Sequence, residues 1–130
     1  GVDKALRAAW EAGVILGGPS AGGMCWFEAG LTDSFGTQLA PLKDGLKFLD
    51  GSFCPHYDSE SLRRPRYLEA VGSGALADGY AVDDGVGLLF AGRDLAEAVA
   101  VLPETRAFRV ERRRGRDAEE TPIRPRLVRG

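Results

Sequence analysis

Three kinds of side chain that lie far apart along the sequence could together attack a carbonyl group. Ser20 lies in the segment GPSAG at 18–22, which fits the G-x-S-x-G pattern of a sharp turn that exposes a serine hydroxyl. A serine hydroxyl is a weak nucleophile until a neighbouring base accepts its proton. The chain has one histidine, His56, so a histidine base must be this residue, although a lone histidine is more commonly an ordinary surface or packed side chain.

A histidine base needs a carboxylate that holds its tautomer and stabilises its charged form. Asp83 and Asp84 follow an apolar segment that predicts a strand, and open parallel sheets place their sites at the ends of strands. Adjacent strand residues point to opposite faces, so only one of these two aspartates can face His56. The same Asp-Asp-Gly sequence is also typical of a turn that ends a strand, and the residues alone leave both interpretations open.

The serine turn also predicts a donor for the negative oxygen of a reacting carbonyl group. The glycines of the pattern leave room for the chain to turn sharply from a strand into a helix. In that geometry the backbone N–H of Ala21 points at the carbonyl oxygen, and the positive end of the following helix supports it. We therefore expect Ala21 to contribute to an oxyanion hole.

The segments around Ser20 predict the elements that hold it. Apolar residues at helical spacing predict a helix over 3–12, and the apolar run 14–16 predicts a buried strand directly before the turn. The small residues after the turn predict a second helix over 21–28. A helix, a strand and a helix in succession indicate an α/β domain whose parallel sheet is flanked by helices.

Further along the chain, the sequence predicts short strands, one helix and a β-rich C-terminal tail. Residues 30–43 are expected to form a loop beside the site, in which Asp33 and Ser34 could receive a substrate amino group or simply form a turn. Ser59 is expected to cap a helix that runs to Val71 with a break at Pro65. Its Arg63 and Arg64 could bind a substrate carboxylate, but a basic pair on a helix is more commonly solvated. The strands are expected at 45–49, 51–54, 79–84 and 85–90, and in the tail at 98–102, 107–111 and 121–128.

Composition narrows the class of protein. The chain has 130 residues, of which 44% are hydrophobic and 28% charged, and its formal net charge is −2. These values fit one soluble globular domain over 1–130 and do not favour a nucleic-acid partner. No apolar run approaches the ~20 residues that cross a membrane, and no secretion signal is evident, so we expect a cytoplasmic protein. Cys25 and Cys54 are too few for a disulfide scaffold, and no metal or other cofactor is expected because no cluster has metal-ligand spacing.

Three segments resemble, in the same order, the motifs of the peptidase E family. They are GPSAGG at 18–23, CPHYD at 54–58 and GYAVDDG at 79–85. That family consists of serine peptidases, among them aspartyl dipeptidase and relatives of cyanophycinase. Three motifs in order are far more specific than any one of them, and the similarity spans nearly the whole chain. The order Ser, His, acid also differs from that of α/β-hydrolases, in which the acid precedes the histidine.

The resemblance implies roles for individual residues and a fold. It implies Ser20 as nucleophile, His56 as base and Asp84 as acid, because the family's acid directly precedes the residue that matches Gly85. Many relatives have glutamate there. The fold implied is flavodoxin-like and similar to class I glutamine amidotransferases. Family members carry their first strands and a glycine-rich loop upstream of the helix at 3–12, so this chain resembles the C-terminal portion of an incomplete domain.

These observations support three hypotheses of different classes. The first is a serine exopeptidase or dipeptidase that acts on short peptides, with aspartate as the first residue in the best-known branch of the family. The second is a catalytically impaired fragment or a non-catalytic interaction module of the same fold. The third keeps hydrolysis but changes the substrate to an ester or to an isopeptide such as cyanophycin.

Overall fold

The computed structural model of the chain describes residues 1–130 except 33–39, 44, 116 and 129–130. Among the described residues it contains three helices, which are α1 (Val2–Glu11), α2 (Ala21–Met24) and α3 (Arg63–Ser73). The described strands are β1 (Phe27–Thr32), β2 (Ala40–Leu42), β3 (Leu49–Cys54), β4 (Gly79–Val82), β5 (Val86–Ala91), β6 (Asp94–Ala100), β7 (Ala107–Arg112), β8 (Ala118–Ile123) and β9 (Arg126–Leu127). The predicted α/β class is confirmed in this coarse form, and the β-rich tail is present as β6 to β9.

The main sheet is mixed and not parallel throughout, which corrects the prediction. Its strand order is β2-β1-β3-β4-β7-β8. Only β1, β3 and β4 run parallel, whereas β2, β7 and β8 each pair with their neighbours in the antiparallel direction. Parallel neighbours need long crossover connections, whereas β7 and β8 follow each other through a short hairpin. The parallel portion therefore consists of β1, which follows the Ser20 turn, and of β3 and β4, which precede His56 and Asp84.

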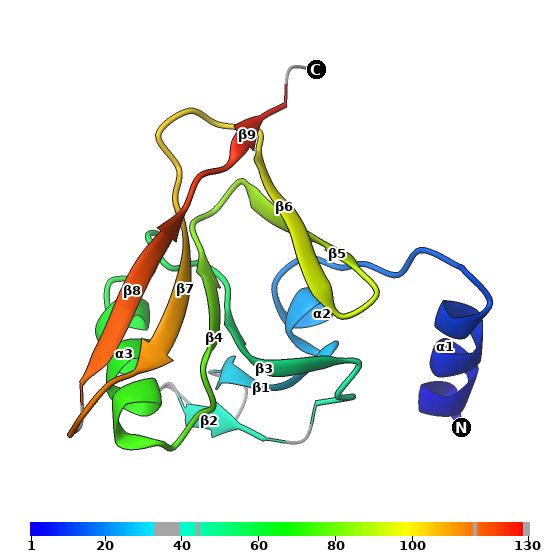
Figure 1. Ribbon diagram of the computed structural model, residues 1–130, viewed down its shortest axis with the longest axis horizontal. Helices are drawn as coiled ribbons and strands as arrows, with labels where there is room; N and C mark the ends of the chain where they lie inside the picture. Colours follow the sequence, from blue (N-terminus) through cyan, green and yellow to red (C-terminus); the bar gives the residue numbers. More distant parts are fainter. Residues whose placement is uncertain (33–39, 44, 116, 129–130) are drawn as a thin grey trace.

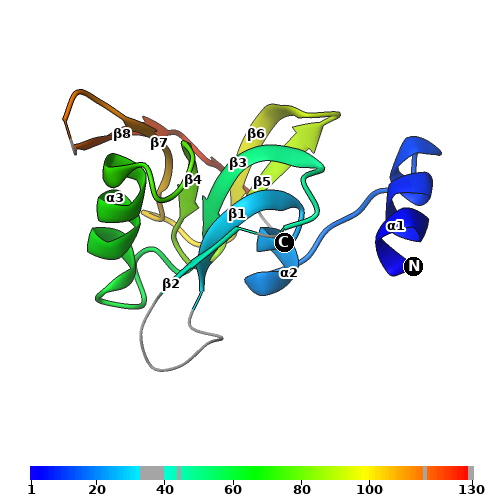
Figure 2. The ribbon, with the colours of Figure 1, turned by 90° about the horizontal axis from the view of Figure 1, so that it is seen from below.

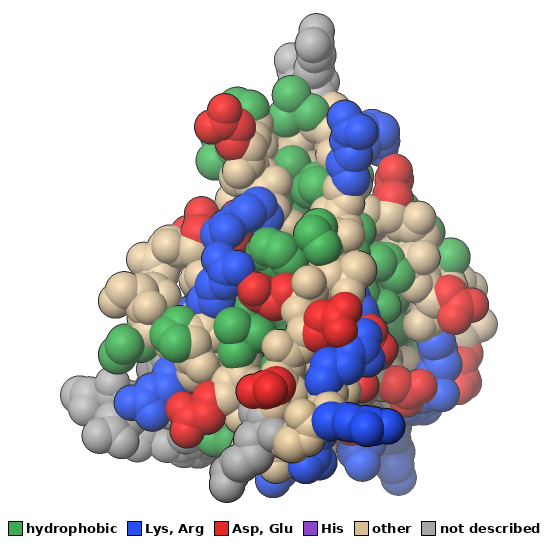
Figure 3. All heavy atoms as spheres, turned by 60° about the vertical axis from the view of Figure 1, so that its left-hand side comes forward, with side chains coloured by type: hydrophobic (Ala, Val, Ile, Leu, Met, Phe, Trp, Pro, Cys, Tyr) green, Lys and Arg blue, Asp and Glu red, His purple; other side chains and the backbone are tan. Residues whose placement is uncertain are grey.

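The remaining strands form a small second sheet with the order β5-β6-β9 (Figure 1). Helix α3 covers one face of the main sheet, and side chains of the second sheet pack against the other face together with α2. Figure 3 shows the side of the molecule where α3 and β8 lie, with acidic and basic side chains interspersed over it. An ion pair between Arg64 and Glu120, 2.7 Å apart, joins these two elements.

Two buried clusters hold the layers together, and β3 contributes to both because its side chains alternate between the faces. Cys54 points to the α3 side, where Tyr67 and Val71 are fully buried. Phe53 points to the opposite side, where its ring stacks on Phe27 with ring centres 5.1 Å apart. The sheet therefore has an apolar core on each face.

Helix α3 differs from its prediction at its start. It begins at Arg63 after Leu62 and not at Ser59, so Pro65 lies in the first turn. The N–H groups of a first turn have no partner within the helix, and a proline there removes nothing. The expected break at Pro65 is therefore wrong. The helix ends before Gly74, whose φ of +83° is the left-handed conformation of a helix cap.

We define residues 1–19 as the N-terminal arm. Its helix α1 stands apart from the sheets in both ribbon views, and the rest of the arm leads from α1 to α2 (Figures 1 and 2). Its helix α1 confirms the predicted helix, but the expected strand at 14–16 does not form, because no described strand pairs with it. Val14 is 52% exposed and Ile15 is 92% exposed. A strand is stabilised by hydrogen bonds to a neighbour. Residues 14–16 therefore have the composition of a strand, but no described neighbouring strand forms hydrogen bonds with them.

Several other elements have different bounds from those predicted, because strand pairing determines where each strand begins and ends. Helix α2 ends at Met24, earlier than expected, because the chain joins the sheet as β1 at Phe27. The strand expected at 51–54 is present as β3, which begins at Leu49, but the separate strand expected at 45–49 does not form, because residues 45–48 are not in a strand. Parts of the expected loop at 30–43 belong to β1 and β2. No helix within the described residues is long and apolar enough to cross a membrane.

Candidate active site

The structure brings Ser20, His56 and Asp84 together although 64 residues separate the first from the last. The His56 Nε2 atom lies 2.8 Å from the Ser20 hydroxyl oxygen, and His56 Nδ1 lies 2.6 Å from Asp84 Oδ1. When Nδ1–H donates to the carboxylate, Nε2 is left as an acceptor for the serine hydroxyl. The ring therefore stands in position to take a proton from Ser20.

Ser20 sits in a turn that only small residues allow. Its φ is +51°, in the left-handed region that residues with a side chain rarely adopt. A Cβ atom on Gly18 would lie 2.5 Å from the carbonyl oxygen of Gly22, and one on Gly23 would lie 2.7 Å from that of Gly18. Both contacts are too short for real atoms. The glycines of the motif are thus required by the close approach of the backbone on either side of Ser20.

His56 occupies the loop at the end of β3 and has a left-handed backbone as well. Its φ is +57°, and Ser20 and His56 are two of the four described non-glycine residues with a positive φ. The next residue, Tyr57, ties the loop to β4, because its N–H donates to the carbonyl of Val82 at 3.0 Å. Strained backbone persists only where the surroundings enforce it, and it is concentrated at functional sites.

Asp84 is held at the end of β4 by the segment that follows His56. The Asp84 N–H donates to a carboxylate oxygen of Asp58 at 2.9 Å. The hydroxyl of Ser59 and, to a smaller extent, the His56 ring hold the pKa of the Asp84 carboxyl below its usual range. Sequence reasoning missed Asp58 and Ser59 as supports, although both directly follow the histidine motif. The carboxylate facing His56 therefore stays ionised further into acid than an ordinary aspartate.

Asp83 has a different place from its neighbour. Its side chain is 3% exposed, and its Oδ2 atom accepts hydrogen bonds from the backbone N–H of Arg106 at 2.8 Å and from the Arg106 side chain at 2.9 Å. Its Oδ1 atom is buried without a partner among the described residues. Of the two neighbouring aspartates, Asp84 is therefore the one whose side chain faces His56. Asp83 instead joins β4 to the segment before β7.

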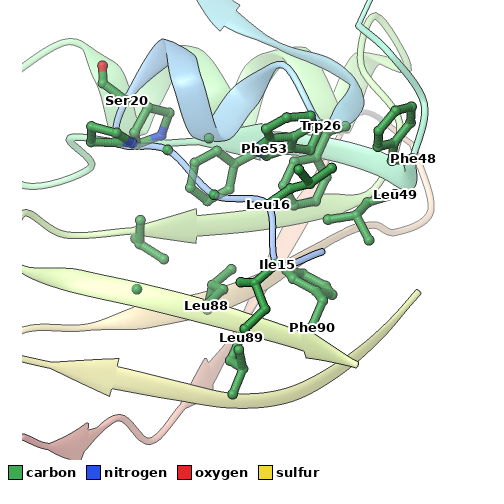
Figure 4. A pocket seen from close by; sticks show the side chains of 18 of the residues that line it. Ile15, Leu16, Ser20, Trp26, Phe48, Leu49, Phe53, Leu88, Leu89 and Phe90 are labelled. Atoms are coloured by element: carbon green, nitrogen blue, oxygen red, sulfur yellow. The ribbon is translucent and has the colours of Figure 1, made fainter. Parts of the chain in front are cut away.

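A cavity of about 790 Å³ extends from Ser20 and His56. Figure 4 shows Ser20 at one end and Phe48 and Leu49 at the other, with Ile15 above Leu89 on β5. Most of its lining is apolar. The described lining residues include three acidic side chains, Glu11, Asp83 and Asp84, and neither lysine nor arginine.

The other predicted site residues fall into three groups. Ala21 begins α2 directly after Ser20. Asp33 and Ser34 lie outside the described residues. Arg63 is buried and donates to the carbonyl of Leu31 at 2.9 Å, and Arg64 pairs with Glu120, so both arginines act within the fold.

No group of three or more metal-ligating side chains occurs in the part of the chain that the structure describes. Cys25 and Cys54 are free thiols. Burial raises the pKa of Cys54 strongly, and burial also raises that of Cys25. Neither thiol is therefore activated as a nucleophile.

Comparisons with known proteins place the chain among peptidases. A sequence model described as Peptidase family S51 matches residues 1–98 of the 130. A protein of Bacillus subtilis (strain 168), named "Uncharacterized peptidase YgaJ", is 49% identical over 110 residues, which are 85% of this chain and 47% of that protein. The chain thus spans about half the length of this relative. No solved structure gives a significant match.

Proposed function

The chain belongs to Peptidase family S51, and from this premise we propose that it contributes Ser20, His56 and Asp84 as the catalytic groups of a serine peptidase for short peptides. Membership implies a fold similar to that of class I glutamine amidotransferases. The observation that carries the proposal is the His56 ring, which lies within hydrogen-bond distance of both the serine hydroxyl and the aspartate carboxylate.

In the proposed reaction the Ser20 oxygen attacks the carbonyl carbon of the scissile peptide bond. His56 Nε2 accepts the hydroxyl proton and then delivers it to the leaving amine, and a water molecule repeats the sequence on the acyl-enzyme. Asp84 keeps Nδ1 protonated and stabilises the imidazolium that forms. The lowered pKa of Asp84 supports this role, because the carboxylate must remain charged while His56 is protonated.

The backbone N–H of Ala21 is the proposed donor to the negative oxygen of the intermediate. A donor at this place acts on charge that develops only during the reaction, and removing one such donor costs about 10²–10³ in turnover. The left-handed turn at Ser20 supports the assignment, since it leads directly into α2 at Ala21.

The proposed substrate is a short peptide, with Asp33 and Ser34 as candidate contacts to its free amino group. A first residue of aspartate would need a cationic partner, and the described cavity lining contains neither lysine nor arginine. Residues 33–39 contain none either. Selection for aspartate therefore has no support in this part of the molecule, and a small peptide of another sequence fits it equally.

The proposal is tested by hydrolysis of a panel of short substrates. The panel contains Asp-X dipeptides, dipeptides with apolar first residues, β-linked peptides and p-nitrophenyl esters. The expected result is cleavage of peptides that falls by at least about 10⁴-fold in Ser20→Ala, with Ser61→Ala in an exposed turn as the matched control. Equal cleavage by Ser20→Ala and the unaltered chain contradicts the assignment of the nucleophile.

Two other outcomes of the panel point to the alternative functions. Cleavage of esters or β-linked peptides alone indicates an esterase or isopeptide hydrolase that uses the same three groups. No cleavage by a folded chain indicates an impaired or non-catalytic unit.

A further inference from the structure

Asp84 is presented to His56 by a short turn that its neighbour Asp83 closes. The carbonyl oxygen of Asp83 accepts a hydrogen bond from the Val86 N–H at 3.2 Å, which makes Asp84 the second residue of a four-residue turn. The third residue, Gly85, has a φ of +86°, a left-handed conformation that glycine adopts without strain. The direction of the Asp84 side chain therefore depends on how the Asp83 carbonyl is held.

A regular strand ladder would use that carbonyl for a different bond. In the antiparallel pairing of β4 with β7, Asp83 and Arg106 come directly after the last strand pair. The Asp83 N–H donates to the Arg106 carbonyl at 2.9 Å, and two residues paired in this way ordinarily exchange a second backbone hydrogen bond. Here the Arg106 N–H donates instead to Asp83 Oδ2 at 2.8 Å. The carboxylate thus replaces the carbonyl in the ladder, and the carbonyl is left to close the turn.

The Arg106 side chain adds a third hydrogen bond, and we call the three bonds between Asp83 and Arg106 the clasp. Its Nε–H donates to the same Oδ2 atom at 2.9 Å, and its guanidinium lies over the Phe108 ring, 5.5 Å from the ring centre. The Asp83 Oδ1 atom is buried and has no partner in the described part of the chain. A buried carboxylate oxygen without a partner is costly, and proteins tolerate such costs mainly at functional sites.

Two other contacts hold the turn, but they act on its later residues. The Asp84 N–H donates to Asp58 in the loop after β3 at 2.9 Å. The Gly85 carbonyl accepts the Val101 N–H, also at 2.9 Å. Neither contact fixes the carbonyl of Asp83. Without the clasp this carbonyl is free to return to the ladder, and the turn then opens at its first residue.

We propose that Asp83 is a positioning residue of the site, and that its clasp with Arg106 holds Asp84 within hydrogen-bond reach of His56. The inference rests on the function proposed above, since it concerns the acid of the same three groups. It gives the two adjacent aspartates separate tasks, because one binds the histidine and the other builds the turn that carries the first. A misplacement of about 1 Å at a catalytic group can lower turnover about 10²-fold, so the clasp acts on the rate of the reaction.

The alternative is an ion pair that only stabilises the end of β4. The Arg106 side chain is 45% exposed, and a pair with an arginine so open to solvent contributes little to stability. Loss of such a pair would leave the contact between Asp84 and His56 unchanged. The two interpretations therefore differ in what happens to the His56 ring, and the experiment measures that ring directly.

The experiment uses nitrogen NMR of the isotope-labelled chain at a pH at which the His56 ring is neutral. His56 is the one histidine of the sequence, so its ring signals are identified without further variants. A hydrogen bond from Nδ1–H to the Asp84 carboxylate favours the Nδ1–H tautomer, whereas a free imidazole in water favours Nε2–H. The expected result for the unaltered chain is a predominant Nδ1–H tautomer.

Asp83→Ala removes the acceptor of the clasp and is expected to move the tautomer ratio toward Nε2–H. For a dipeptide that the unaltered chain cleaves, kcat should fall about 10- to 100-fold with KM within about twofold. Asp83→Asn keeps an acceptor oxygen for the Arg106 N–H and should restore most of both losses. Arg106→Ala keeps the two bonds that its backbone makes, so the same changes should be smaller. Its side chain is half-exposed, so this variant gives the answer if Asp83→Ala does not fold.

Arg109→Ala is the matched control for Arg106→Ala. Arg109 lies on β7, is 34% exposed and lies over an aromatic ring, 4.9 Å from the ring centre of Tyr80. Its acidic neighbour is Glu111, at 4.0 Å, and not Asp83. The control is expected to leave the tautomer ratio and kcat as they are in the unaltered chain.

The outcomes separate the positioning role from the proposed activity. An unchanged tautomer ratio in folded Asp83→Ala and Arg106→Ala overturns the inference, even if urea unfolds both variants more easily. An equal shift in Arg109→Ala overturns it too, because the effect is then not specific to the clasp. The expected shifts in a chain that hydrolyses no peptide support the positioning role and contradict the proposed activity. A predominant Nε2–H tautomer in the unaltered chain overturns both.

Discussion

The N-terminal arm and the main sheet differ in how their apolar residues are used. In the sheet, Tyr67, Val71 and Val110 are all fully buried between α3 and the strands. In the arm, the apolar run 14–16 is exposed at Val14 and Ile15 and pairs with no described strand. Burial and pairing stabilise the first region, whereas the second lacks both.

This difference divides the candidate site between the two regions. His56 and Asp84 stand on loops that the sheet anchors, through contacts of Tyr57 with Val82 and of Asp58 with Asp84. Ser20 stands where the arm meets α2. The base and the acid are therefore expected to keep their geometry independently of the arm, and the nucleophile is the part whose placement depends on it.

The largest expected effect in the sheet-anchored part follows from Asp84→Asn. The amide oxygen and nitrogen can bind the wrong tautomer of His56, and such a change lowers turnover about 10⁴-fold in a triad of this type. Folding stability should change little, because the Asp84 side chain is exposed. Peptide hydrolysis and thermal unfolding of the same sample measure both. Asp83→Asn is the control, and a larger loss of hydrolysis there than in Asp84→Asn would reverse the assignment of the acid.

A second comparison sets the two regions against each other in stability. Tyr67→Ala should lower the free energy of unfolding by about 3–5 kcal/mol, because a fully buried ring is removed. Its hydroxyl also lies 2.6 Å from that of Ser52. Trp10→Ala in the arm should lower it by about 1 kcal/mol or less, since only the stack on Phe48 is lost. Urea unfolding of both variants measures the difference, and equal losses would show that the arm is part of the cooperative core.

A smaller effect is expected from Asp58→Ala, which removes the acceptor for the Asp84 N–H. The loss of one hydrogen bond to a charged group should lower turnover about tenfold. Asp58→Asn keeps an acceptor oxygen and should restore most of the loss. If both variants hydrolyse peptides at the unaltered rate with unchanged dependence on pH, Asp58 does not position Asp84.

The smallest expected effect is a change in the acid dependence of Asp84 in Ser59→Ala. Because the folded-state pKa of Asp84 lies below its ordinary value, its carboxylate stabilises the fold above that ordinary value and loses this effect as the pH falls through the lowered pKa. Removing the Ser59 hydroxyl should move the pKa of Asp84 upward, so that the carboxylate is lost at a higher pH. Carboxyl chemical shifts followed by NMR during an acid titration measure this. An unmoved or lower pKa would show that Ser59 does not stabilise the carboxylate.

Local patterns predicted much of the fold. The helix of the arm and the strands before His56 and Asp84 occur where the apolar spacing placed them, and the tail is β-rich as predicted, although its strands β6, β8 and β9 have other bounds than expected. The family was predicted from three motifs, and the match to Peptidase family S51 confirms it. The roles of Ser20, His56 and Asp84 stay predictions, although the structure places the three side chains within hydrogen-bond distance.

What the sequence could not predict depends on contacts between distant segments. The run at 14–16 has the composition of a strand, but its pairing depends on a neighbour that local composition does not specify. Asp58 is separated from Asp84 by 26 residues, and their hydrogen bond appears only when β3 and β4 lie side by side. The antiparallel direction of β7 and β8 was missed for the same reason. A strand joined by a hairpin and one joined by a crossover can have similar apolar patterns, so the pattern does not specify the direction.

The most direct test of the central claim is the reaction of the chain with a serine-directed fluorophosphonate, followed by mass spectrometry of its peptides. The account predicts a single modification at Ser20, at a rate that falls at least about 10²-fold in His56→Ala, because the ring no longer takes the hydroxyl proton. Modification of Ser20 at the same rate in both proteins, with His56→Ala folded as the unaltered chain, would contradict the claim that His56 activates this serine.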